Sequence, residues 1–107
     1  MYRLFIILNL FFSTAKGQTI FVVDSSKQIY IVFKTYYNED VTKFNIQQSS
    51  NNKNWKAIPN AVIPPDSKEG INTYVYPLEP KQNYYRVKAT FKTGSVQYGQ
   101  VAYMKLQ

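Results

Sequence analysis

Six carboxylates are the side chains of this 107-residue sequence best suited to acid–base chemistry, because the sequence contains neither histidine nor cysteine. General acid–base catalysis needs a positioned group with a tuned pKa, most often a histidine or a carboxylate pair. A serine or threonine nucleophile needs a neighbouring base to activate it. All six carboxylates fall in segments that we expect to be turns or loops: Asp24, Glu39, Asp40, Asp66, Glu69 and Glu79. We therefore expect no enzymatic activity and no cofactor.

Two acidic pairs, Glu39 with Asp40 and Asp66 with Glu69, invite comparison with calcium sites. Calcium takes six to eight oxygen ligands at defined spacing, which neither pair supplies. Adjacent acids in a turn are better explained by turn formation, since their side chains bond to nearby backbone amides. The absence of cysteine removes thiolate metal sites and disulfides. Phosphate-binding and dinucleotide glycine patterns are also absent, so we expect no metal site.

The first 17 residues differ from the rest of the sequence, and we expect the strands that position any site to begin after them. Residues 1–17 comprise a basic start at Arg3, an apolar run from Leu4 to Phe12 and a small-residue end, which is typical of a secretory signal peptide. Cleavage before Gln18 fits best, and cleavage after Ala15 is the alternative. An N-terminal strand or buried helix is the competing interpretation. The run is too short for a membrane-spanning helix of about 20 residues.

The remaining segment, residues 18–107, is long enough for one domain. We expect it to be exported, to the periplasm or to the cell surface and beyond. Loss of Arg3 and Lys16 with the signal peptide leaves 11 basic against 6 acidic residues, a net charge of +5. Such a charge favours anionic surfaces, including lipopolysaccharide, acidic glycans or an acidic partner. Export, scattered basic residues and a modest charge argue against nucleic acid, and a solvated surface is the simpler explanation.

Short runs rich in tyrosine, phenylalanine, valine and isoleucine alternate with turn-forming clusters such as "SSNNKN" and "KTGS". Within each run, apolar residues recur every second position, which places them on one face of a strand. About seven strands with turns every 8 to 12 residues indicate an all-β antiparallel sandwich. The residues expected in its core are Ile31, Phe33, Phe44, Ile46, Trp55, Tyr74, Tyr76, Leu78, Tyr85 and Val87.

The segment "NYYRVKATFKTGSVQYG", residues 83–99, closely resembles the last hairpin of fibronectin type III-like domains. The likeness is to the version found in exported bacterial proteins that often carry a C-terminal sorting domain, which this sequence does not contain. Upstream, "FNIQQSSNNKNWKAI" and "TYVYPLEP" resemble the same family in the same order. The resemblance covers nearly all of residues 28–106 and implies an immunoglobulin-like sandwich.

Two details of that hairpin stay open. The Leu78 and Pro80 spacing implies a corner tyrosine at Tyr84, whereas the alternation puts Tyr85 in phase with Val87. Gly99 is expected to break the last strand.

The resemblance implies that the third, sixth and seventh strands of the sandwich share a sheet. Its outer face is then the candidate binding face, for a protein or a glycan, with Tyr84 and Arg86 as typical interface anchors. The alternatives are a nonspecific binder of anionic surfaces and a structural subunit of a surface assembly. The expected residues of this face are Lys43, Asn45, Gln47, Tyr84, Arg86 and Lys88, extended by Gln97 and Gln100. The loop from Pro59 to Gly70 is a second candidate contact.

Overall fold

The computed structural model describes residues 4–7 and 19–106. Its strands are β1 (Leu4–Ile7), β2 (Thr19–Val23), β3 (Ile29–Tyr36), β4 (Val41–Ser49), β5 (Lys56–Ile63), β6 (Ile71–Leu78), β7 (Asn83–Phe91), β8 (Val96–Tyr98) and β9 (Ala102–Leu106). The described residues contain strands and no helix, as the composition predicted.

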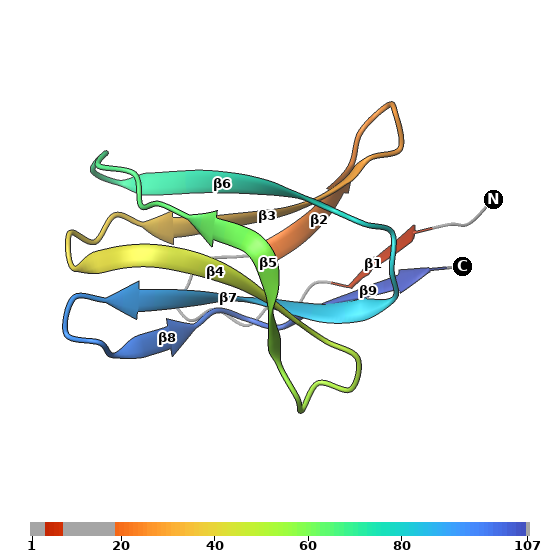
Figure 1. Ribbon diagram of the computed structural model, residues 1–107. Helices are drawn as coiled ribbons and strands as arrows, with labels where there is room; N and C mark the ends of the chain where they lie inside the picture. Colours follow the sequence, from red (N-terminus) through yellow and green to blue (C-terminus); the bar gives the residue numbers. More distant parts are fainter. Residues whose placement is uncertain (1–3, 8–18, 107) are drawn as a thin grey trace.

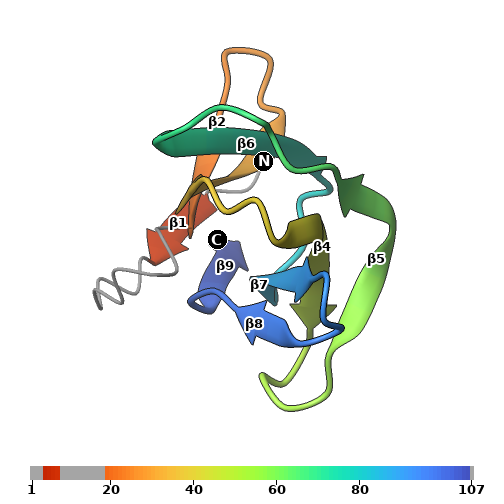
Figure 2. The ribbon, with the colours of Figure 1, turned by 90° about the vertical axis from the view of Figure 1, so that its left-hand side faces the viewer.

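Two antiparallel sheets form the molecule (Figures 1 and 2). The smaller sheet has the order β2-β3-β6. The larger, six-stranded sheet has the order β1-β9-β7-β4-β5, and β8 pairs with β7. The predicted all-β antiparallel sandwich is therefore confirmed, and its strand order is compatible with the fibronectin type III resemblance.

The core lies between the two sheets because alternate residues of each strand point inward. One buried cluster gathers around Ile31, Ile46 and Tyr85 and a second around Phe33 and Phe44. Edge-to-face rings join the sheets in the first cluster, where the Phe21 and Tyr85 ring centroids lie 5.6 Å apart. Packing alone must hold this sandwich, since the sequence has no cysteine.

Most of the residues expected in the core do lie between the sheets. Ile31, Phe33, Phe44, Ile46, Leu78, Tyr85 and Val87 are buried. Tyr74 and Tyr76 are partly buried and pack against the two clusters. Trp55 differs from expectation: it precedes β5 and its ring contacts Arg86 on the outer face of the larger sheet. An indole half exposed over a cationic side chain is stabilised without entering the core.

The last strand is interrupted between Tyr98 and Ala102, where we expected Gly99 to break it. The amide of Gly99 donates a hydrogen bond to the carbonyl of Val87 at 2.8 Å, so the chain still follows β7 through the break. β8 and β9 are thus two parts of one interrupted strand, each paired with β7.

The segment expected as a loop from Pro59 to Gly70 is partly strand, since β5 extends to Ile63. The β4–β5 register shifts between Asn45 and Gln47, which leaves an irregular stretch of β5 around Asn60. Asn60 has φ of 65°, a conformation that asparagine tolerates better than most residues. This distortion turns Ala61 into the core, where it is fully buried.

The expected signal peptide, residues 1–17, lies outside the described residues except for β1. That strand pairs antiparallel with β9, with Leu4 opposite Leu106 and Ile7 opposite Tyr103. The pairing does not test whether the segment is removed. Among the described residues no helix is long and apolar enough to cross a membrane.

Candidate functional site

The outer face of the larger sheet collects the six residues that the sequence predicted as a binding face. Lys43, Asn45 and Gln47 point outward from β4, and Tyr84, Arg86 and Lys88 point outward from β7. Register pairs Asn45 with Lys88 and Gln47 with Arg86, so the two strands place these side chains next to each other. Alternation along two neighbouring strands thus assembles the face.

Arg86 lies on this face in contact with two aromatic rings. Its guanidinium carbon is 4.3 Å from the centroid of Trp55 and 3.8 Å from that of Tyr98. Its Nε donates a hydrogen bond of 2.7 Å to Oε1 of Gln47. A planar guanidinium suits this arrangement because it stacks on aromatic faces while donating in its own plane. Arg86 therefore holds Trp55, Tyr98 and Gln47 in place.

Tyr84 lies outside the core and packs on Tyr103 of β9. The two ring centroids are 4.5 Å apart with 32° between the ring planes. Tyr85, its neighbour, is instead buried, and burial raises the pKa of its phenol. The alternation of β7 has therefore kept Tyr85 as the core tyrosine, with Tyr84 on the outer face.

Two cationic side chains extend the face beyond this aromatic group. Lys88 lies beside Tyr98 of β8 and Asn45 of β4, its partners in register. Lys43 is exposed farther along β4, opposite Thr90. The face therefore has an aromatic part around Arg86 and a cationic part at Lys43 and Lys88.

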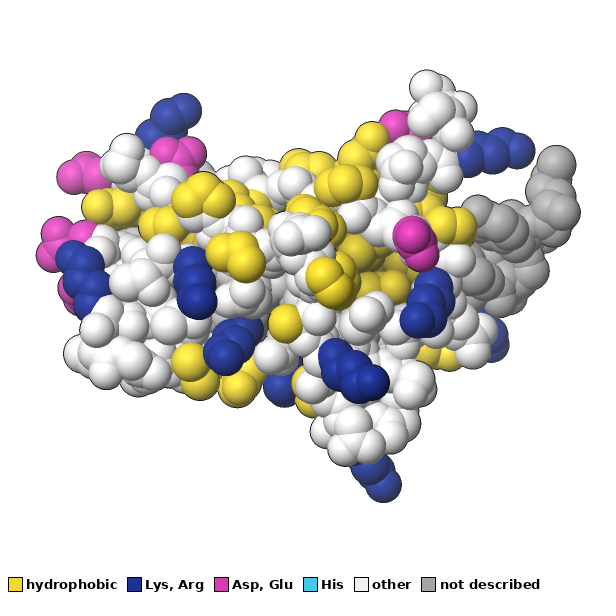
Figure 3. All heavy atoms as spheres, in the orientation of Figure 1, with side chains coloured by type: hydrophobic (Ala, Val, Ile, Leu, Met, Phe, Trp, Pro, Cys, Tyr) yellow, Lys and Arg dark blue, Asp and Glu magenta, His cyan; other side chains and the backbone are white. Residues whose placement is uncertain are grey.

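Carboxylates are absent from the described strands. All six acidic residues of the sequence lie in turns and loops, where the sequence placed them. The strands of the larger sheet carry basic side chains instead: Lys43, Lys56, Arg86, Lys88 and Lys105. In Figure 3, Lys and Arg side chains are scattered over the visible face, from its upper corners to its lower tip, whereas Asp and Glu lie mainly toward the left and right ends. The charged side chains on the strands of this sheet are therefore all basic.

Gln97 and Gln100 do not join the face as the sequence suggested. Gln97 pairs with the inward-pointing Ala89 and lines a pocket between the sheets. Gln100 lies in the break between β8 and β9, half buried. Gln97 takes its direction from the regular pairing of β8 with β7, in which Tyr98 is opposite Lys88. Gln100 follows Tyr98 in the irregular stretch, where strand alternation no longer applies.

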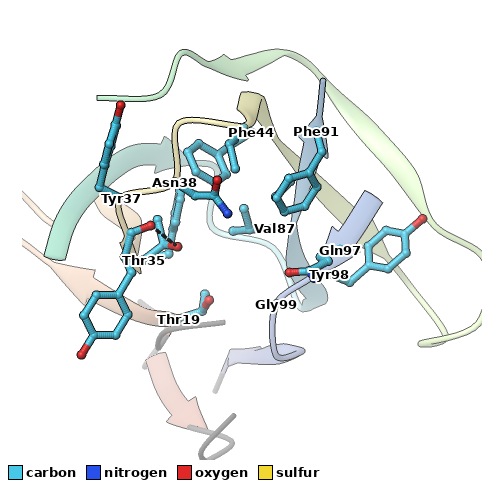
Figure 4. Close-up of a pocket in the computed structure, with 14 residues that line it drawn as sticks. Thr19, Thr35, Tyr37, Asn38, Phe44, Val87, Phe91, Gln97, Tyr98 and Gly99 are labelled. Atoms are coloured by element: carbon cyan, nitrogen blue, oxygen red, sulfur yellow. Dashed lines mark hydrogen bonds between the residues drawn. The ribbon is translucent and has the colours of Figure 1, made fainter. Parts of the chain in front are cut away.

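That pocket opens between the ends of the two sheets and has a volume of about 320 Å³ (Figure 4). Its walls are apolar, from Phe33, Phe44, Val87 and Phe91, and the polar groups of Thr19, Asn38 and Gln97 lie around them. Its described lining residues include no charged side chain. The volume is at the small end for a ligand site, and the pocket was not visible in the sequence because residues from five strands form it.

The geometry offers no acid–base constellation among the described residues. Asp24 accepts hydrogen bonds at Oδ1 from the amide and hydroxyl of Ser26 and from the amide of Gln28, at 2.9, 2.6 and 3.0 Å. The hydroxyl of Ser26 is the main cause that lowers the pKa of Asp24. This carboxylate forms a turn between β2 and β3. In the part of the chain that the structure describes, no group of three or more potential metal-ligating residues lies together.

Comparisons with known proteins add no relative: no protein-family model, curated protein or solved structure matches this chain. The class of protein that the fold itself defines is a small antiparallel β-sandwich. Any functional assignment beyond that class must come from the site.

Proposed function

We propose that this chain is an exported, non-enzymatic interaction module of the fibronectin type III-like kind, acting at the cell envelope or outside the cell. Its binding face is the outer face of the larger sheet, and its partner is a protein or glycan that presents acidic groups. The observation that carries the proposal is the grouping of aromatic and cationic side chains on strands that contain no carboxylate.

The aromatic part of the face favours a specific partner over a general polyanion. Tyrosine, tryptophan and arginine are enriched where interfaces gain most of their binding energy. Here the stacking of Arg86 and the pairing of Tyr84 with Tyr103 hold these rings before any partner arrives. A preorganised face loses less conformational entropy on binding than a set of mobile side chains.

The cationic part supplies attraction at a distance. Lys43 and Lys88 have no carboxylate beside them within their strands, so their charge is available to an acidic partner. Such charges raise the association rate, and their contribution falls as salt screens them. We expect partner binding to weaken with salt while keeping a salt-resistant part from the aromatic contacts.

Affinity capture with the tagged chain tests this proposal, using envelope and extracellular fractions at low and moderate salt. We expect one stoichiometric partner to be retained at both salts and lost from the double variant Tyr84→Ala, Lys88→Ala. The control is Lys34→Ala on the smaller sheet, which should bind as the unchanged chain does. Retention of polyanions alone, lost entirely as salt rises, would favour the nonspecific alternative.

A structural role in a surface assembly predicts a different result. A strand-paired subunit is held by backbone hydrogen bonds at a sheet edge rather than by side chains of one face. A stoichiometric partner that survives the double variant would therefore support the structural role and contradict the proposed binding face.

A further inference from the structure

The outer face of the smaller sheet is apolar although it points to solvent. Val22 is 40% exposed, Val75 is 57% exposed, and Tyr36 and Ile71 are each 60% exposed. The register of the sheet groups them into rows across the three strands. The residues of this apolar face are Ile20, Val22, Tyr30, Val32, Tyr36, Ile71, Val75 and Pro77, and Lys34 and Thr73 are the polar residues among them.

A solvated sheet face usually carries polar side chains at these alternate positions. Single exposed apolar residues need no explanation, but a contiguous group of them on one sheet is a mark of an interface. Hydrophobic side chains are visible along the β6 margin of the molecule in Figure 3, at the upper edge of this face. The apolar face is therefore a second surface, distinct from the outer face of the larger sheet.

We propose that the apolar face is covered by a second copy of this chain, packed face to face across a two-fold axis near Val32. Val32 lies on β3, the central strand, between Ile20 of β2 and Val75 of β6. The proposed axis lies in the plane of the interface and runs perpendicular to β3, along the row formed by Ile20, Val32 and Val75. Rotation about it places each of these residues over the same residue of the partner. Isologous packing of this kind is the commonest arrangement of homodimers.

Charge complementarity supports a second copy as the occupant. The same axis exchanges positions two residues before and two residues after Val32, so Lys34 of each copy lies over Tyr30 of the other. Tyr30 donates a hydrogen bond of 3.1 Å from its hydroxyl to Oδ2 of Asp24. The ammonium group of Lys34 in each copy thus approaches the Tyr30–Asp24 pair of the other copy. This contact between opposite charges occurs twice in the dimer.

The area of the face sets the expected strength. Three strands of eight residues or fewer span roughly 26 Å by 14 Å. The resulting area of about 360 Å² is less than half of the roughly 800 Å² that each partner of a standard interface buries. We therefore expect a weak dimer with a dissociation constant in the micromolar range or above, whose two binding faces on the larger sheets both point away from the interface.

Sedimentation equilibrium tests the dimer at protein concentrations of about 0.01 to 1 mM, with the chain used as it is purified after any processing by the expression host. We expect the mass to rise from monomer to dimer. Val75→Lys should weaken association by about tenfold or more, because each interface then contains two additional buried charges. The matched control is Val62→Lys on the opposite sheet, where Val62 is 53% exposed; it should leave association unchanged.

A crosslinking measurement keeps the proposal testable if Val75→Lys fails to fold. The sequence has no cysteine, so Val32→Cys introduces the only thiol of the chain. Packed sheets lie about 10 Å apart, which is too far for a disulfide but suits a short bis-maleimide. We expect Val32→Cys to give a covalent dimer much faster than the control Val62→Cys.

Three results would overturn the proposal. The first is a monomer across the whole concentration range, and the second is equal crosslinking of the two cysteine variants. The third is a dimer that Val62→Lys weakens as much as Val75→Lys. Binding of the monomer to neutral phosphatidylcholine vesicles, lost in Val75→Lys, would instead assign the face to a lipid surface and would also contradict the dimer.

Discussion

The guanidinium carbon of Arg86 lies over the ring of Tyr98, 3.8 Å from the ring centroid. The same guanidinium carbon lies 4.3 Å from the ring centroid of Trp55. One side chain therefore connects β7 to the start of β5 and to β8, three segments that are separate in the sequence. This contact organises the face to which we assign binding.

We predict that Arg86→Lys lowers the free energy of unfolding by about 1–2 kcal/mol. Lysine loses the planar stacking on two rings and the in-plane bond to Gln47, and each cation–π contact of this kind is worth about 0.5–1 kcal/mol. Urea denaturation measures the change. Lys88→Arg is the control, since Lys88 has no such stack, and an Arg86→Lys midpoint equal to that of the control would refute the stabilising role of Arg86.

A truncated side chain in the core should lower stability more than a truncated side chain on the surface. Ile46 is fully buried between the sheets. Ile46→Val should cost about 1 kcal/mol, because removing one buried methyl group leaves a small cavity. Val62→Ala removes two methyl groups from an exposed position and should change stability by about 0.5 kcal/mol or less. Thermal denaturation of both variants distinguishes them, and equal losses would place the core elsewhere.

The turn between β2 and β3 should give stability a dependence on pH. Hydrogen bonds from Ser26, from Gln28 and from Tyr30 lower the pKa of Asp24 in the folded chain. A carboxylate with a lowered folded pKa contributes stability above its unfolded pKa near 4, and this contribution disappears as the pH falls through the folded value. Asp24→Asn should therefore be less stable than the unchanged chain at pH 7, and the difference should shrink below about pH 3.

Denaturation of both proteins across that pH range makes the comparison. Because Asp24 is exposed, the loss at pH 7 should be small. A difference that stays constant down to pH 2 would show that the effect comes from side-chain geometry rather than from charge.

The turn between β7 and β8 depends on Gly94, which has φ of 88°. No atom lies within 4 Å of the position that a Cβ would occupy there, so a side chain meets only a conformational cost. Gly94→Ala should destabilise the hairpin by about 1 kcal/mol, and Gly94→Asn should cost less because asparagine tolerates positive φ. Equal stabilities of the two variants in urea would contradict this backbone argument.

Sequence reasoning predicted the sandwich because alternation determines which residues point inward. Ile31, Phe33, Phe44 and Ile46 follow that rule, and so does Tyr85, which lies in phase with Val87. The same rule put Lys43, Gln47 and Arg86 on the outward sides of their strands. The resemblance to fibronectin type III-like domains, which implies that these strands share a sheet, brought the three together. Local pattern was sufficient wherever the strand was regular.

The local sequence pattern was insufficient where backbone irregularities or contacts between distant segments determine the direction of a side chain. The pairing of Gln97 with Ala89 directs Gln97 toward the pocket, and the irregular stretch of β5 buries Ala61. Trp55 was expected in the core, yet its ring contacts Arg86, 31 residues away in the sequence. Nothing in the spacing of Trp55 indicated that contact.

The most direct test of the proposed binding face is a backbone amide NMR titration of the chain with a sulfated oligosaccharide, with oligoglutamate in parallel. Binding through the outer face of the larger sheet predicts chemical-shift changes concentrated on β4, β7 and β9, at Lys43, Lys88 and Tyr103 above all. These changes should vanish in Lys88→Glu and persist in Lys34→Glu. Changes spread evenly over the molecule, or centred on β2, β3 and β6, would contradict the assignment of binding to this face.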